Sequence, residues 1–207
     1  MNAMSALSST ALLTAVSFFS QGVGFVYRVA LSRLVGSEVM GLYQLVMPVF
    51  SVLLSLTAVG FTAASSNLSA RYLATGDRRG AGQVVRQCVL GFLCSFLVVA
   101  ALAAPLSDAI SVHLLGDARA RLGLLLLLPC VLLTGLENIH KHFFYGAGAV
   151  RGPAFTEICE QLIRSGAVLG LLWRFLPQSP ERTVGLIVCG MILCEVFSAL
   201  TLTLLYR

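Results

Sequence analysis

The chain has 207 residues, of which 57% are hydrophobic and only 11% are charged, and its mean hydropathy is +0.90. Because soluble domains carry about 25% charged residues, this composition excludes an ordinary soluble protein. The net charge is +5, but the basic residues sit mostly at the ends of apolar runs, where they would meet lipid headgroups. They form no patch interleaved with aromatic residues, so we expect no nucleic-acid partner.

Three stretches contain no charged side chain, namely residues 1–27, 39–70 and 87–107. Each is long enough to cross a bilayer, which takes about 20 apolar residues in a helix. One span and its loop occupy about 30 residues, so the chain has room for roughly six spans. The first basic residue is Arg28, whereas a cleaved signal peptide needs a positive region before its apolar run. We therefore expect the first run to be a real span.

In chain order, the apolar runs predict spans at approximately residues 6–31, 41–68, 84–104, 122–144, 154–176 and 184–206. The loops between them are short, so successive helices should be antiparallel neighbours. The runs do not alternate with period two, as the strands of a membrane barrel would. The expected fold is therefore all-α, a single polytopic membrane helix bundle over residues 1–207.

A polar stripe marks the first span. Gln21, Gly24 and Arg28 are spaced i, i+3 and i+7, which places them on one helical face. One interpretation is a stripe that lines a cavity, with Arg28 able to hold an anionic phosphate. The other is that the glycine permits close helix packing and that Arg28 extends its charge to the membrane interface.

The fourth span carries a polar patch at residues 137–142. Glu137 and His140 have the Glu-x-x-His spacing found in di-metal helix bundles. Such a site needs further carboxylates and a second histidine nearby, and the chain has three His in all. We expect no metal, and we interpret the patch as cavity-lining or as an interface.

The fifth and sixth spans add ionisable groups at membrane depth, where charges are costly. Glu160 and Arg164 form an i, i+4 pair in the favourable order, either as an internal ion pair or as a gate. Glu195 lies near the centre of an apolar run, where it could carry a proton or pair with Arg164. The candidate substrate-binding residues are thus Arg28, Gln21, Gly24 and Glu195, and the candidate gating or ion-pair residues are Glu160, Arg164 and Glu137.

Arginines also indicate an orientation. The loop after the second span holds Arg71, Arg78, Arg79 and Arg86, and arginine-rich loops remain in the cytoplasm. With six spans, this predicts that both termini are cytoplasmic.

Four segments carry a resemblance to a known family. They are GFVYR at 24–28, LSRLVG at 31–36, GLYQL at 41–45, and EQLIR at 160–164, which follows a glycine-rich turn. Together they resemble the polysaccharide-biosynthesis and stage V sporulation protein B group. That group belongs to the multidrug/oligosaccharidyl-lipid/polysaccharide (MOP) superfamily, and the resemblance extends from about residue 17 to residue 172.

The resemblance implies one lobe, the N-terminal one, of a MATE-like two-lobe transporter in the bacterial cytoplasmic membrane. It implies a flippase for undecaprenyl-linked sugars, not an enzyme, and no cofactor. Arg28 is the best match to a cavity arginine of the family, whereas Arg33 belongs to the same motif at the membrane edge. The partner would be a missing C-terminal lobe or a second copy.

Two alternatives remain open at this point. The first is a cation-coupled multidrug exporter of the same superfamily, in which Glu195 could serve as the acid. The second is a non-transporting membrane partner subunit, for which replacing Arg28 and Glu195 should have no effect.

Overall fold

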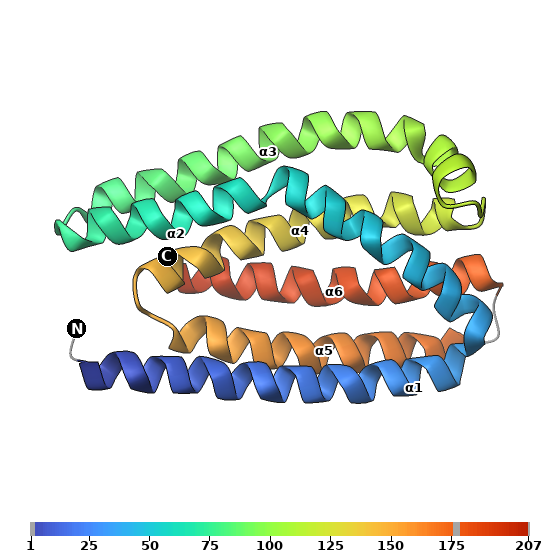
Figure 1. The fold of residues 1–207 in the computed structure, drawn as a ribbon, viewed down its shortest axis with the longest axis horizontal. Helices are drawn as coiled ribbons and strands as arrows, with labels where there is room; N and C mark the ends of the chain where they lie inside the picture. Colours follow the sequence, from blue (N-terminus) through green and yellow to red (C-terminus); the bar gives the residue numbers. More distant parts are fainter. Residues whose placement is uncertain (1–2, 176–178, 207) are drawn as a thin grey trace.

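The computed structural model describes residues 3–175 and 179–206, with side chains from residue 10 onward, and all of the regular elements in these ranges are helices. This confirms the predicted all-α class. Figure 1 shows the long helices arranged along one common direction. They are α1 (Ala3–Thr57), α2 (Val59–Ala74), α3 (Arg78–Ala109) with a short π-helical turn η1 (Ile110–Leu114), α4 (Ala120–Gly146), α5 (Arg151–Phe175) and α6 (Pro180–Tyr206).

Four helical segments are long and apolar enough to cross a membrane: Thr10–Thr57, Arg78–Leu114, Ala120–Gly146 and Pro180–Tyr206. Helix α5 is not among these four, since it carries five charged residues, and α2 has only 16 residues. The individual boundaries of the six expected spans therefore stay predictions. The expected end of the fifth span at residue 176 and the two chain ends lie outside the described residues.

Helix α1 is broken at Gly36, whose backbone is non-helical with φ 78° and ψ 175°. This left-handed φ is accessible to glycine without steric cost, because glycine has no Cβ. The chain reverses direction at the break and returns through the second part of α1 into α2 (Figure 1). The predicted spans 6–31 and 41–68 lie on either side of this residue.

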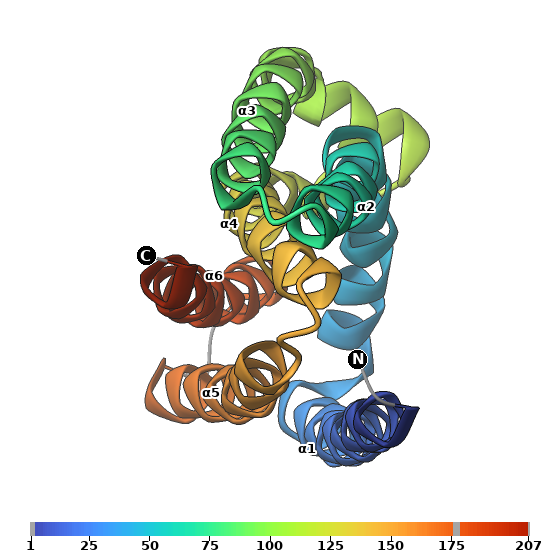
Figure 2. The same cartoon turned by 90° about the vertical axis from the view of Figure 1, so that its left-hand side faces the viewer.

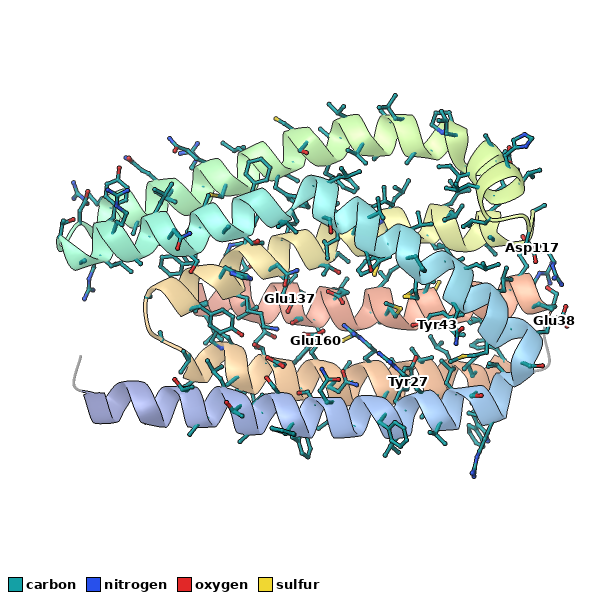
Figure 3. The ribbon with its side chains drawn as sticks, in the orientation of Figure 1. Tyr27, Glu38, Tyr43, Asp117, Glu137 and Glu160 are labelled. Atoms are coloured by element: carbon teal, nitrogen blue, oxygen red, sulfur yellow. The ribbon has the colours of Figure 1, made fainter. Side chains whose placement is uncertain are left out.

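A surface clamp, made of Glu38, Asp117 and Arg119, ties the broken end of α1 to the loop before α4 (Figure 3). The Arg119 guanidinium donates to Glu38 Oε1 at 2.6 Å and to Asp117 Oδ2 at 2.9 Å. Hydrogen bonds from the Arg119 side chain and backbone hold the pKa of Asp117 below its ordinary value, since they stabilise its charged form. The clamp is exposed to solvent, so its effect on stability is expected to be small.

Two helix-ending turns of the same kind close the opposite end of the bundle. At the end of α2, Gly76 has φ 80°, its N–H donates to Leu73 O, and the N–H of Asp77 donates to Tyr72 O. Gly148 makes the equivalent turn after α4. Both are Schellman turns, which use a left-handed glycine to satisfy the last carbonyls of a helix. The start of α1 lies at this same end of the bundle (Figure 1).

Helix α4 lies between two apolar cores. Leu127 belongs to a core with residues of α1, α5 and α6, whereas Ile139 belongs to a core with α3 residues such as Phe92. Figure 2 shows the same arrangement end-on, with α2 and α3 to one side of α4 and α5 and α6 to the other. Helix α4 is therefore the central helix of the bundle.

Glycines allow the helices to approach closely at two contacts. A Cβ at Gly146 on α4 would lie closer than 3.0 Å to the backbone oxygen of Ser66 on α2. A Cβ at Gly190 on α6 would lie 2.6 Å from a Val168 methyl group on α5. Small residues serve the same purpose in membrane helix packing generally, because close backbones gain dispersion contacts that lipid does not offer.

The outer faces of the helices expose large apolar side chains. Phe18 and Phe25 on α1 are 77% and 69% exposed, and Trp173 on α5 is 83% exposed. In water such surfaces would favour aggregation. In a bilayer they face hydrocarbon, which supports a membrane location for the whole bundle.

Candidate functional site

A cavity of about 480 Å³ opens between α1, α4, α5 and α6. Most of its lining side chains are polar or charged, although the surrounding helices are apolar. Tyr27, Tyr43 and Glu160 line it, and their labels mark its position in Figure 3. A polar cavity at membrane depth is where ionisable residues can persist, because it keeps them hydrated or lets them meet a ligand.

The predicted stripe of the first span lies on this cavity. Gln21, Gly24 and Arg28 all contribute to its wall, as the i, i+3, i+7 spacing requires. Gly24 also faces α5, because a Cβ there would lie 3.1 Å from the Gln161 amide nitrogen. Gly24 thus permits a close approach between α1 and α5 and also lies on the cavity wall.

Arg28 differs from the other cations of the cavity. Its side chain is exposed, and no ion pair involves it among the described residues, whereas both Lys141 and Arg164 are paired with carboxylates. An unpaired guanidinium open to a cavity is suited to an anion, because its planar fork matches phosphate or carboxylate oxygens.

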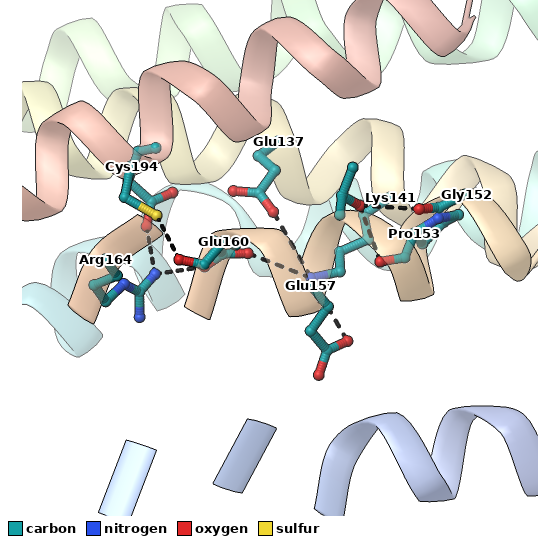
Figure 4. Close-up of polar contacts among 10 residues, drawn as sticks. Glu137, Lys141, Gly152, Pro153, Glu157, Glu160, Arg164 and Cys194 are labelled. Atoms are coloured by element: carbon teal, nitrogen blue, oxygen red, sulfur yellow. Dashed lines mark hydrogen bonds and ion pairs between the residues drawn. The ribbon is translucent and has the colours of Figure 1, made fainter. Parts of the chain in front are cut away.

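An ion network forms the opposite wall, and Lys141 on α4 is one of its two cations (Figure 4). Lys141 Nζ lies 3.7 Å from Glu137 Oε1, 3.9 Å from Glu157 Oε2 and 3.9 Å from Glu160 Oε2. Three carboxylates from two helices thus share one ammonium group. Its side chain is 14% exposed, so these attractions act in a medium less polar than water.

Arg164 on α5 is the second cation and joins α5 to α6. Its Nη2 donates to Glu160 Oε1 at 2.5 Å and to Glu195 Oε1 at 2.9 Å. The thiol of Cys194 on α6 donates to the backbone oxygen of Glu160 at 3.1 Å. The structure therefore contains the i, i+4 pair that the sequence predicts and also the pairing of Glu195 with Arg164.

Glu195 and Glu137 do not line the cavity. Both are almost completely buried, at 1% and 2% exposed, and they lie behind the wall that Glu160 and Lys141 form. Glu195 is thus placed for an indirect role and makes no direct contact with the cavity. The predicted roles in substrate binding and gating remain predictions for all seven residues.

Three carboxylates come close enough to be considered for a cation. One oxygen each of Glu137, Glu160 and Glu195 lies within 4.8 Å of the others. Lys141 and Arg164 already contact this group, which disfavours a divalent metal ion by charge repulsion. The Glu-x-x-His pattern does not converge here, because His140 Nδ1 bonds to the Leu136 carbonyl at 2.8 Å and its ring makes an edge-on contact with Tyr206.

Aromatic side chains complete the cavity lining, and their position there is not among the predictions from the sequence. Tyr27 and Tyr43 approach from α1, and Tyr145 and His142 from α4, with the last two rings in edge contact at 5.7 Å. Such rings present apolar faces and polar edges to a ligand. Tyr27 lies three residues after Gly24, so the helical spacing that predicts the stripe could have included it.

The bundle and its cavity define a class: a polytopic helical membrane protein with a charged, polar site inside the bundle. Residues 6–207 match the family described as polysaccharide biosynthesis protein, and the chain belongs to this family. This confirms the family resemblance that the sequence segments carry.

The relatives agree with this assignment. Stage V sporulation protein B of Bacillus subtilis (strain 168) is 27% identical over 203 residues, which cover 97% of this chain and 39% of that protein. The solved structure of a MOP superfamily transporter from Pyrococcus furiosus Vc1 (DSM3638) matches with a TM-score of 0.71 at 19% identity, over 94% of this chain and 43% of the other. The chain therefore shares that fold and spans about two-fifths of each relative.

Proposed function

We propose that this chain is the N-terminal half of a flippase that moves a lipid-linked oligosaccharide across the membrane by alternating access. The family and the relatives support a transporter of this kind. The single observation that carries the proposal is Arg28, an unpaired arginine that opens into a polar cavity at membrane depth.

In this proposal, Arg28 holds the diphosphate group that joins lipid and sugar. Amides such as Gln21 and Gln161, with the rings of Tyr27 and Tyr145, contact the sugar hydroxyl groups and apolar sugar faces. The polyprenyl chain stays in the lipid outside the bundle. No covalent bond is made or broken, so the chain needs neither catalytic residues nor a cofactor.

The proposed location is the bacterial cytoplasmic membrane, with both chain ends in the cytoplasm. Arg71, Arg78 and Arg79 lie at or beside the turn between α2 and α3. The start of α1 and the end of α6 lie at this same end of the bundle (Figure 1). The positive-inside rule then assigns this end to the cytoplasm. A C-terminal lobe or a second copy would supply the other wall of the transport path.

The test uses the full chain in lipid nanodiscs and an undecaprenyl diphosphate-linked sugar as the probe. Arg28→Ala should weaken binding by about tenfold to a hundredfold, because a hydrogen bond to a charged group contributes about 1.5–3 kcal/mol and each 1.4 kcal/mol is tenfold. The matched control is Arg33→Ala on the same helix, which is exposed and lies outside the cavity lining.

Equal affinity for the Arg28→Ala and Arg33→Ala proteins would contradict the role of Arg28. If neither the parent nor the variants bound the probe, the partner-subunit alternative would replace the flippase. The exporter alternative needs an acid that binds a cationic drug or a coupling ion, and Glu195, its candidate, lies outside the cavity lining and does not meet a drug there.

A further inference from the structure

The ion network contains more negative than positive charge. Glu137, Glu157, Glu160 and Glu195 supply four carboxylates, and they face two cations, Lys141 and Arg164. If every group were ionised, the network would carry two uncompensated negative charges. Such an excess is strongly unfavourable inside a helix bundle at membrane depth, because no bulk water screens it.

The deepest member of the network also lacks a hydrogen-bond partner. Glu195 Oε1 accepts from Arg164, but Glu195 Oε2 has none, although the residue is only 1% exposed. The hydroxyl of Ser198, one turn further along α6 and 0% exposed, also lacks a partner. A buried polar atom without a partner is costly. A proton on a carboxyl oxygen would turn an unpaired acceptor into a donor.

We propose that the carboxylates of Glu137, Glu160 and Glu195 hold one exchangeable proton, carried on Glu195 and reached from the cavity through Glu160. Glu160 lines the cavity, and its carboxylate lies within 4.8 Å of the other two. A proton fits this cluster better than a metal ion, because it needs no space between carboxylates that two cations already contact.

The groups that face Glu195 come from every helix around it. Opposite charge comes from α5, where Arg164 bonds it directly, and like charge comes from α4 and α5. Neutral titratable groups are near as well, on α1, α4 and α6. The groups that act on Glu195 itself are Glu137 and Cys130 on α4, Glu160 and Arg164 on α5, and Cys194 on α6. Lys141 and Glu157 reach it only through Glu137 and Glu160, and Tyr27 and Tyr43 on α1 only through Arg164 and Cys130.

The proposed exchange is balanced in atoms and charge. A proton from cavity water forms an O–H bond on one carboxylate of the cluster, and the same bond breaks when the proton returns to water. An anion in the cavity would add negative charge beside Glu160 and would draw Lys141 and Arg164 toward itself. Both effects favour the protonated form, so anion binding and proton uptake are linked. This link, unlike the proton site, rests on the proposed function.

The test is infrared spectroscopy of the full chain in nanodiscs, which detects the carbonyl stretch of a protonated carboxyl group. We expect such a band at neutral pH, its loss at high pH, and its shift to lower frequency in heavy water. Glu195→Gln should remove it, and Glu181→Gln, which changes an exposed acid at the start of α6, should leave it intact. Glu137→Gln serves as the second variant if Glu195→Gln does not fold.

The proton site would be overturned by absence of the band at every pH at which the protein stays folded. Persistence of an unchanged band in both Glu195→Gln and Glu137→Gln would overturn it too.

Inorganic pyrophosphate tests the link separately. It should move loss of the band to higher pH, and Arg28→Ala should abolish this shift. A band that pyrophosphate does not move leaves the proton site standing and counts against anion binding in the cavity, and hence against the proposed function.

Discussion

Replacement of Arg164 by methionine removes the side chain that joins α5 to α6 and retains an unbranched chain of similar length. Glu195 loses its hydrogen-bond partner, and Glu160 keeps only the more distant Lys141 at 3.9 Å. The side chain of Glu195 is 2% exposed and that of Glu160 is 14% exposed. Glu160 would therefore keep a buried charge without its close partner, or take up a proton, and the carboxyl group of Glu195 would lose its hydrogen bond.

Breaking a buried ion pair from one side costs about 3–5 kcal/mol of the free energy of unfolding. Because the Arg164 side chain is 26% exposed, we expect the lower end, about 3 kcal/mol. The double variant Arg164→Met/Glu160→Gln should recover about 2 kcal/mol, because it no longer buries the unpaired charge of Glu160.

Free cysteines provide the assay. Cys88, Cys130 and Cys194 are buried and unpaired, so a thiol-reactive dye reports their exposure during unfolding in mixed detergent micelles of increasing SDS content. Arg33→Met is the control, and a change within about 0.5 kcal/mol is expected for such a surface substitution. A cost for Arg164→Met no larger than that of the control would refute the reasoning. Failure of Glu160→Gln to restore stability in the Arg164→Met background would do the same.

Two further predictions concern the free energy of unfolding, the first measured by the same thiol assay and the second by circular dichroism, because protonated thiols do not react with the dye at acid pH. Gly146→Ala should destabilise the protein by about 1–3 kcal/mol, because its Cβ would press on the Ser66 backbone oxygen. Gly166→Ala, whose Cβ would meet open space, should stabilise it by about 0.5–1 kcal/mol; equal effects would contradict the close packing of α2 and α4. Asp117 has a folded-state pKa below its ordinary value, so its contribution is full above the ordinary pKa and is lost as the pH falls through the folded one. Asp117→Asn should flatten the acid side of the stability curve, and an unchanged acid side would show that the bonds to Arg119 contribute nothing.

The general fold follows from hydropathy, and so does the break at Gly36, which lies between the predicted spans 6–31 and 41–68. Long charge-free runs predict the helices, since an apolar chain in lipid must satisfy its own backbone hydrogen bonds. The interruption at Ala58, between α1 and α2, is harder to foresee, because it lies inside the charge-free run 39–70 and within the predicted span 41–68. Helix α5 is also predicted as a span, because its second half is an apolar run. Its charged residues keep it from being one of the helices that are apolar enough to cross a membrane.

The candidate site follows from the sequence in part. Helical spacing brings Gln21, Gly24 and Arg28 to one wall, because these residues belong to one helix. The network across helices depends on how α4, α5 and α6 pack, so the position of Lys141 beside three carboxylates is not contained in any local pattern. Glu195 shows how far a local pattern can predict a contact. The sequence leaves open whether Glu195 carries a proton or pairs with Arg164, and only the packing of α5 on α6 brings Arg164 to it.

The outward position of Trp173 gives this protein a built-in optical marker. The chain has one tryptophan, and this residue is 83% exposed near the end of α5. The ultraviolet emission of the unmodified protein therefore originates at a single lipid-facing point and is not an average over several rings. Quenching groups attached at different depths along lipid tails would read the depth of that point directly. Hydropathy describes the membrane position of α5 least well. Fluorescence can locate this same helix without a label.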